Sequence, residues 1–369
     1  MIALEELNTL PPREFVAALA SVFEHSPWVP ERVAGSRPFA SGIALHEAMC
    51  GAVMQADESL QLALIRAHPE LAGRAEVRGN LTPASISEQK GAGLSACTPI
   101  EYERLQTLNT AYRGRFDFPF VLAVKGHTPQ SVIATLERRA THGRDEERNV
   151  ALQEICRIAR FRIADLVDES IGGAIIAMAE DLARCSESPN GLTCSYLTPT
   201  HIATAARIRD FMLAAGLTVH EDAVGNVVGV LPGNGGNLRR LLTGSHYDTV
   251  IDAGKYDGRL GILLPIAVAG AMRRAAVQLP YPLEIIAFAE EEGVRFKSIE
   301  SIARDPARLL GFVEVHIGQG PVLLDAGMLL VRCGNGGISH HPAETLSAAD
   351  AAVAARVFQD FLQHFTVSA

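Results

Sequence analysis

Three consecutive glutamates, Glu290, Glu291 and Glu292, follow directly after the apolar run of residues 283–289. An isoleucine-rich run of this length is typical of a buried strand. Three like charges at the end of a strand repel one another, and a bound cation would offset that repulsion. The alternative is a solvated acidic patch, which is the commoner meaning of such a run. The cation hypothesis therefore needs further ligands elsewhere in the chain.

Side chains of the metal-ligand type do occur in the same half of the chain. His246 and Asp257 lie in a glycine-punctuated stretch after an apolar run, and imidazole and carboxylate are typical zinc ligands. Asp248, two positions after His246, could fix the orientation of the imidazole ring. His316 and His340 lie at a further strand end and in a glycine-rich loop. Open α/β sheets keep their sites at such positions, which favours one shared site, although a lone histidine is more often structural.

The first half of the chain contains a different set of reactive side chains. His68 precedes Pro69, and because a proline pushes the residue before it out of helical geometry, a helix should end there. The imidazole would then point off the helix end, or would be an ordinary capping or surface histidine. Ser85 and Glu88 form the S-x-x-E pattern of a capping box, which would pin Glu88 against the backbone. Gln89 follows as a donor and acceptor.

Two further features of the first half favour a small anionic substrate. Residues 112–126 are an aromatic and apolar run with an internal proline, which predicts a rigid wall with free backbone amides. Arg162 lies seven positions after Ile155 and therefore on the same apolar helix face. A buried arginine needs a partner, either an internal acid or an anionic ligand. Its planar fork suits a carboxylate.

The elements that must position these residues differ between the two halves. The first half shows helical periodicity, with a possible break near Gln55, and predicts helices at residues 41–67, 99–116 and 144–167. From about residue 171, apolar strands alternate with helices, which predicts an α/β sheet. The expected strands are residues 225–233, 239–246, 283–290, 311–318 and 327–333, and the expected helices are residues 201–217, 261–275 and 346–365. The fold prediction is an all-α domain, residues 1–168, followed by an α/β domain, residues 171–369.

Composition excludes several classes of protein. The 369 residues carry a net charge of −9 and no basic block, so nucleic acid is not an expected partner. The sequence contains no stretch of about 18 uninterrupted apolar residues, so we expect no membrane span. The acidic N-terminus lacks the features of a secretory signal. The six cysteines are scattered and form no CxxC pair, so we expect no disulfide framework and a cytoplasmic location.

The motifs of the first half resemble one family in order and wording. "HSPWVPERVAGSRPF", "LIRAHPEL", "SISEQKGAGL", "FPFVLAVKG" and "IARFRIADLV" are similar to those of 2-oxo-4-hydroxy-4-carboxy-5-ureidoimidazoline (OHCU) decarboxylases, over nearly all of residues 1–168. The resemblance implies cofactor-free decarboxylation to (S)-allantoin in urate breakdown. It implies His68 as catalytic acid/base, together with Glu88 and Arg162. It implies that the substrate is bound by Pro69, Ser85, Glu88, Gln89, Phe120, Val121, Leu122, Ala123, Val124 and Arg162.

The motifs of the second half resemble another family. "GSHYDTV", "GKYDGRLG", "EEEGVRF", "HIGQGP" and "GISHHPAE" are similar to the zinc-dependent amidohydrolase branch of peptidase family M20, which acts on allantoate or N-carbamoyl amino acids. The resemblance implies up to two zinc or manganese ions and Glu291 as general base. The implied ligands are His246, Asp257 as a bridge, Glu292, His316 and His340.

The second half also departs from this family. His340 comes only 24 positions after His316, where the family has a lid and dimerisation domain. Gly318 and Cys194 replace a usual glutamate and a frequent arginine. The expectation is therefore a truncated M20-like domain without that lid. It would be a hydrolase, a non-catalytic scaffold or oligomerisation module, or a decayed and poorly folded tail. A homo-oligomer is a possible assembly.

Overall fold

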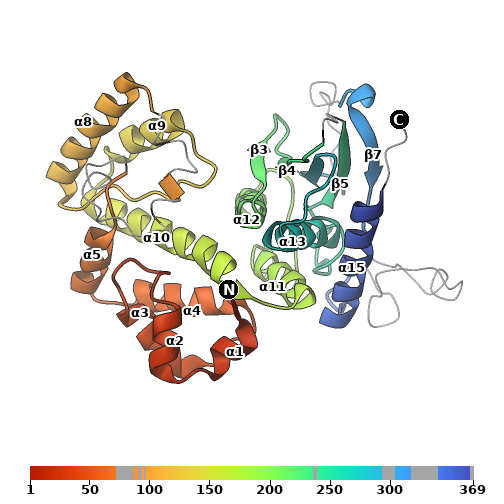
Figure 1. Cartoon of the computed structure of the whole chain (residues 1–369), viewed down its shortest axis with the longest axis horizontal. Coiled ribbons are helices and arrows are strands. Elements are labelled where there is room, and N and C mark those ends of the chain that lie inside the picture. The colour runs from red at the N-terminus through yellow and green to blue at the C-terminus, as the bar shows by residue number, and fades with distance from the viewer. Residues whose placement is uncertain are drawn as a thin grey trace, which may run out of the picture. The chain divides into compact units, whose positions relative to one another are not determined.

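The chain divides into two compact units, Met1–Asp168 and Glu169–Ala369, in the computed structural model (Figure 1). The structure describes residues 1–71, 85, 88–89, 94, 97–235, 239–292, 304–316 and 340–365. None of the helices within these ranges combines the length and the apolar content needed to cross a membrane.

The first unit is helical. Its helices are α1 (Leu4–Thr9), α2 (Pro12–Ala18), α3 (Trp28–Val33), η1 (Ala34–Ser36), α4 (Gly42–Met54), α5 (Glu58–Ala67), α8 (Pro99–Phe116), α9 (Pro129–Arg139) and α10 (Arg144–Leu166). The predicted break near Gln55 is confirmed, because α4 ends there and α5 begins after Asp57, whose carboxylate accepts a hydrogen bond from Leu60 N. Two short strands, β1 (Ile2–Ala3) and β2 (Val167–Asp168), pair in parallel.

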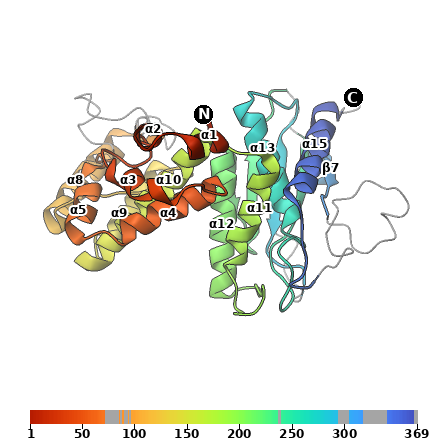
Figure 2. The ribbon, with the colours of Figure 1, turned by 90° about the horizontal axis from the view of Figure 1, so that it is seen from below.

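Helix α10 organises the first unit. It packs against α4 and α5, while α8 packs against α9 (Figure 2). Its buried stripe includes Ile155, Ile158 and Ala159, and Arg162 lies on the same stripe at 8% exposure. The predicted helix of residues 144–167 and the burial of its arginine are therefore confirmed. The buried end of α10 brings this charge to the interior of the unit.

The second unit is built on a five-stranded mixed sheet. Its strands are β3 (Thr218–Glu221), β4 (Val227–Leu231), β5 (Arg240–His246), β6 (Leu283–Phe288) and β7 (Leu309–Val313), in the order β3-β4-β6-β5-β7. Strands β5, β6 and β7 are parallel, whereas β3 and β4 are antiparallel to their neighbours. Parallel strands end at the same edge of the sheet, so the residues after β5, β6 and β7 come together.

Among the described residues of this unit, four α-helices accompany the sheet: α11 (Ile171–Ala183), α12 (Pro199–Ala215), α13 (Leu260–Arg274) and α15 (Ala348–His364), and the 3-10 helix η4 (Pro306–Arg308) precedes β7. Helices α12 and α13 lie against the strands, and α11 and α15 pack on α13 (Figure 2). Helix α12 ends at Gly216, whose φ of 92° is left-handed and favours glycine. The expected α/β architecture is confirmed. The expected strand of residues 327–333 and the last residues of 311–318 lie outside the described residues.

Candidate active site

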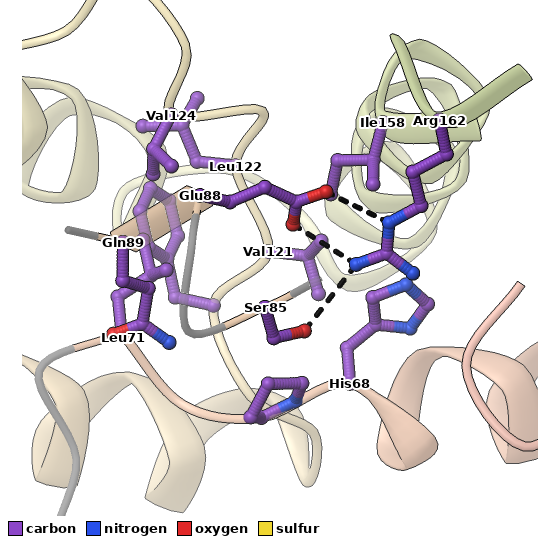
Figure 3. A pocket seen from close by; sticks show the side chains of 12 residues that line it. His68, Leu71, Ser85, Glu88, Gln89, Val121, Leu122, Val124, Ile158 and Arg162 are labelled. Carbon is purple, nitrogen blue, oxygen red and sulfur yellow. Dashed lines mark hydrogen bonds and ion pairs between the residues drawn. The ribbon is translucent and has the colours of Figure 1, made fainter. Parts of the chain in front are cut away.

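A small polar pocket lies inside the first unit (Figure 3). Its walls come from the end of α5, from the segment before α8, from the segment between α8 and α9, and from α10. They are lined by His68, Pro69, Leu71, Ser85, Glu88, Gln89, Phe120, Val121, Leu122, Val124, Ile158 and Arg162. The cavity volume is about 30 Å³, which is about the space of one water molecule. The structure therefore brings together every residue proposed for this site from sequence, with the exception of Ala123.

His68 lies at the break predicted from the following proline. Helix α5 ends at Ala67, and His68 has an extended backbone with φ −75° and ψ 138°. The imidazole is buried, and its Nδ1 donates a hydrogen bond of 2.9 Å to the carbonyl of Leu64. Because a carbonyl can only accept, Nδ1 must carry the proton and Nε2 is the basic nitrogen. The alternative of an ordinary surface histidine is wrong.

The environment of His68 favours the neutral ring. Burial lowers the pKa of His68 from 6.5 to about 4; the hydrogen bond to Leu64 opposes this shift, and the charge of Arg162 adds to it. The neutral form therefore dominates at pH 7. An ordinary histidine would titrate near neutrality, whereas the pKa of this ring lies well below it, so His68 must take up a proton before it can deliver one.

Arg162 binds two carboxylates. Its Nε and Nη2 donate to the two oxygens of Glu88 at 2.7 and 2.9 Å, in a side-on fork (Figure 3). Nη2 also donates to Oε1 of Glu24 at 3.0 Å, and Nη1 donates to the carbonyl of Ser21 at 3.1 Å. Burial alone would lower the pKa of Arg162, but the hydrogen bonds and charges of Glu88 and Glu24 raise it. Of the two partners that the sequence left open, the structure shows an internal acid, and there are two of them.

The capping-box interpretation of Ser85 and Glu88 is wrong. Both oxygens of Glu88 accept from Arg162 instead of reaching back to the backbone, and the Ser85 hydroxyl donates to Glu24 at 2.5 Å. The sequence pattern fits a cap, but a buried guanidinium attracts a carboxylate more strongly than a backbone amide does. Glu24, which is 3% exposed, was missed by sequence reasoning. Its only signal is its position next to the "HSPW" motif.

Side chains outside the pocket fix the backbone of the apolar wall, residues 120–124. Val121 accepts a hydrogen bond of 2.8 Å on its carbonyl from Nη1 of Arg139, which pairs with the fully buried Glu147. The guanidinium of Arg139 also lies 4.6 Å from the centre of the Phe120 ring. The amide of Ala123 donates to Glu154 at 2.8 Å. The expectation of free amides along the whole wall is therefore wrong at Ala123, which does not line the pocket.

A second cluster lies at the carboxyl edge of the parallel strands in the second unit. His246 ends β5, Glu292 follows β6, and Asp257 precedes α13; one ligand-type atom from each lies within 4.8 Å of the others. The Nε2 atom of His340 lies 2.5 Å from Oδ2 of Asp257, and that of His316 lies 3.8 Å from Oδ1. The other four side chains proposed as ligands therefore lie around Asp257, whose Oδ2 faces His340 and whose Oδ1 faces His316.

Asp248 supports this cluster. Its carboxylate lies 3.3 Å from Nδ1 of His246 and accepts the amides of Glu291 and Glu292 at 3.0 to 3.1 Å. Burial alone would lower the pKa of His246, but the hydrogen bond and charge of Asp248 raise it to about 9. Glu291 is 64% exposed, and its Oε2 lies 4.0 Å from Nε2 of His246.

The donor set fits a divalent metal ion. Neutral imidazoles and carboxylates are the ligands that zinc and related ions prefer. The imidazole of His246 packs against the backbone of Gly258. A Cβ at this position would lie 2.4 Å from Nε2 of the histidine, so only glycine leaves room for the ring. The loop that carries Asp257 is fixed by Glu344, whose Oε2 accepts the amides of Tyr256 and Asp257 at 2.9 and 3.3 Å. The residues present are therefore suited to holding an ion.

Residues 8–164 match the family model described as OHCU decarboxylase. A curated 2-oxo-4-hydroxy-4-carboxy-5-ureidoimidazoline decarboxylase of Haloferax volcanii is 44% identical over 164 residues, which cover 44% of this chain and 95% of the relative. The chain belongs to the OHCU decarboxylase family. The pocket around His68 therefore lies in the part of this OHCU decarboxylase family member that is shared with its relatives.

The remainder of this OHCU decarboxylase family member matches other proteins. Residues 242–329 match the family model described as peptidase family M20/M25/M40. An allantoate deiminase of Arabidopsis thaliana is 34% identical over 203 residues, which cover 43% of this chain and 39% of the relative. A solved structure of a hydantoinase/carbamoylase family amidase from Burkholderia ambifaria is 27% identical, with a TM-score of 0.37, over 42% of this chain and 47% of that chain. The chain thus spans only part of the hydrolases it matches.

Proposed function

We propose that the first unit decarboxylates 2-oxo-4-hydroxy-4-carboxy-5-ureidoimidazoline to (S)-allantoin, as part of urate breakdown. The observation that carries the proposal is the buried pocket in which His68, Glu88, Gln89 and Arg162 meet a wall of apolar residues. Its polar groups suit a small ureido acid, and residues 8–164 of this unit match the family model of OHCU decarboxylase. No cofactor is part of the proposed reaction.

The chemistry of this substrate requires three proton movements. Loss of carbon dioxide from ring carbon 4 leaves an electron pair, which moves into the neighbouring imine, and the imine nitrogen takes a proton from solvent. The hydroxyl on carbon 4 then loses its proton, while carbon 5 gains one. Hydrogen-bond donors near the developing charge lower the barrier. The side-chain amide of Gln89 and the guanidinium of Arg162 are donors that line the pocket.

His68 is suited to the second and third of these movements. Its neutral ring has a basic Nε2, because Nδ1 donates to Leu64. It would accept the hydroxyl proton and return a proton to one face of carbon 5, which sets the handedness of the product. The binding site would use Pro69, Ser85 and the wall residues Phe120, Val121, Leu122 and Val124 to hold the ring.

The proposal is tested by mixing the full chain with substrate generated freshly by urate oxidation. The expected result is a faster loss of the substrate's ultraviolet absorbance and a circular dichroism signal of (S)-allantoin. A decay rate equal to the uncatalysed one, or a racemic product, would contradict the proposal.

The cluster around Asp257 favours a second, hydrolytic function. We infer that the second unit binds one or two zinc or manganese ions through His246, Asp257, Glu292, His316 and His340, and hydrolyses allantoate or an N-carbamoyl amino acid. A bound ion would supply an acidified water and a polarised carbonyl. The Oε2 atom of Glu291 lies 4.0 Å from Nε2 of His246, beside the proposed ion, where this carboxylate would take a proton from water as a general base.

Metal content separates this hydrolase from a non-catalytic scaffold. Purified chain should retain one or two zinc or manganese ions, and His246→Ala should lose them together with ammonia release from allantoate. An empty chain that releases no ammonia would favour the scaffold, and ready proteolysis after residue 168 would favour a poorly folded tail. A cytoplasmic location and a homo-oligomeric assembly are further parts of the proposal.

A further inference from the structure

Arg162 is shared between two carboxylates that differ in burial. The Glu24 side chain is 2% exposed, whereas the Glu88 side chain is 29% exposed. Glu24 accepts a hydrogen bond from Nη2 of the guanidinium. Glu88 covers the side-on edge formed by Nε and Nη2 (Figure 3). Rotation of a side chain that already reaches solvent costs less than removal of a charge from the interior. Glu88 is therefore the partner that can leave, and Glu24 the one that stays.

The small size of the pocket favours such a departure. A cavity of about 30 Å³ holds a water molecule but not an imidazoline ring with ureido and carboxylate substituents. Glu88 lines this cavity and occupies the edge of Arg162 that best matches a carboxylate. A substrate carboxylate placed on that edge would reproduce the two hydrogen bonds that Glu88 gives up.

The segment that carries Glu24 contacts both terminal nitrogens of the Arg162 guanidinium. Nη1 of Arg162 donates to the Ser21 carbonyl at 3.1 Å, and the Ser85 hydroxyl donates to the same Glu24 oxygen that receives Nη2. His25, directly after Glu24, has a φ of 46°, a left-handed backbone that is uncommon outside glycine. Strain of this kind persists where surrounding contacts demand it. The chain therefore turns directly after Glu24, beside the residue that contacts Arg162.

We propose that Glu24 is a positioning residue of the decarboxylase site: it remains the counter-ion of Arg162 and holds the guanidinium in place. The Nε–Nη2 edge, where Glu88 lies in this structure, then becomes available to the carboxylate of the substrate. The inference rests on the proposed decarboxylation. It assigns to Glu24 no contact with substrate, so its effect must pass through Arg162.

The charges around His68 affect the pH dependence of kcat/KM, which would not change if Glu24 only stabilised the fold. Arg162 on α10 and His25 lower the pKa of His68, whereas Glu24 raises it. Glu88 acts on the same guanidinium from the segment before α8. Removal of the Glu24 charge should therefore move the acidic limb of the kcat/KM profile to lower pH.

The test compares Glu24→Gln, Glu24→Asp and the control Glu31→Gln, each in the full chain. Glu31 is an exposed glutamate of α3, close to Glu24 in sequence. Loss of a charge-assisted hydrogen bond should lower kcat/KM of Glu24→Gln about 10- to 100-fold and shift its acidic limb. Glu24→Asp keeps the charge, so it should keep the limb in place and recover part of the activity. Glu31→Gln should equal wild type.

The same substitution is then made in an Arg162→Lys background. If Glu24 acts through the guanidinium fork, Glu24→Gln should cost less than about threefold there. Wild-type kcat/KM and an unmoved limb in Glu24→Gln, or an equal loss in both backgrounds, would overturn the inference while leaving decarboxylation intact. If Glu24→Gln does not fold, an acidic limb that moves in Glu24→Asp, which keeps the charge, overturns it. Wild type and Glu31→Gln that both fail to decarboxylate would remove the proposed function and the inference together.

Discussion

At the scale of single residues, the burial of His68 links catalysis to pH. The folded ring resists protonation until about pH 4, whereas an ordinary histidine accepts a proton near pH 6.5. Between these values the unfolded chain binds more protons, so the folded state loses stability as pH falls from about 6.5 to about 4. Above pH 6.5 the ring is neutral in both states and contributes no slope.

We predict that His68→Gln removes this slope. Between pH 6.5 and pH 4, wild type should lose up to about 3 kcal/mol of stability relative to the variant, because folding lowers the pKa of His68 from 6.5 to about 4. Trp28, the only tryptophan, lies in the first unit, so its fluorescence during urea unfolding at pH 7 and pH 4.5 reports on this unit. Equal pH dependence of the two proteins would show that His68 is not buried as described.

The second residue-scale prediction concerns the charge that Arg162 neutralises. Arg162→Ala should destabilise the first unit by about 3–5 kcal/mol, because it leaves the buried Glu24 carboxylate without this partner. The double variant Arg162→Ala, Glu24→Gln should recover much of the stability, since the charge is gone, but none of the decarboxylase activity. Urea unfolding monitored by Trp28 fluorescence measures the stability of the single and the double variant, and (S)-allantoin formation measures their activity. An additive double variant would contradict the pairing.

At the scale of elements, the network behind the wall connects α8, α9 and α10. The carboxylate of Glu147 on α10 accepts from Arg139 on α9 and from the hydroxyl of Tyr112 on α8, and His142 Nδ1 lies 2.8 Å from its other oxygen. Arg139 in turn holds the Val121 carbonyl. Three helices therefore fix the backbone of the pocket wall through one buried ion pair.

We predict that Glu147→Gln weakens both the unit and its site. It leaves the buried Arg139 charge uncompensated, so the stability should fall by about 3–5 kcal/mol, and kcat/KM should fall at least about tenfold as the wall loosens. The control is Glu137→Gln, in which the broken pair with Arg104 is 42% and 55% exposed and should change stability by less than about 0.5 kcal/mol. Similar midpoints for the two variants in urea would contradict the role of the network.

Sequence patterns predicted the elements whose signals are local. The break at His68 follows from the next proline, and the end of α12 follows from Gly216. Helix α11 was missed because its Gly172–Gly173 pair resembles a linker. Gly172 is instead a packing position, where a Cβ would lie 1.8 Å from the Ala348 carbonyl oxygen on α15. Strand β3 was missed because it is short and mostly exposed.

The site was predictable to the extent that its residues lie in recognisable motifs. His68, Glu88, Gln89 and Arg162 were found, but Glu24 was not. It meets Arg162 across 138 positions of sequence, and only the folded chain shows that contact. The capping box at Ser85 failed for the same reason, because a distant guanidinium outcompetes the local backbone for Glu88.

At the scale of the whole molecule, the two units should respond separately to metal. An ion that binds only the folded second unit raises its stability in proportion to the logarithm of ion concentration. Zinc should therefore raise the unfolding transition of this unit, followed by hydrogen exchange of β5 and β6, and leave the Trp28 transition in place. Asp257→Asn should abolish the shift. A zinc effect on Trp28 fluorescence alone would contradict the assignment of the cluster.

The central claim is that the buried imidazole of His68 moves the protons of decarboxylation. The most direct measurement is the initial rate of (S)-allantoin formation from freshly oxidised urate by wild type, His68→Ala and the control His364→Ala, whose imidazole is exposed on α15. Loss of an acid–base group should lower the rate of His68→Ala by at least about 10³-fold, while His364→Ala keeps the wild-type rate. A His68→Ala variant that forms (S)-allantoin within about threefold of wild type would contradict the account.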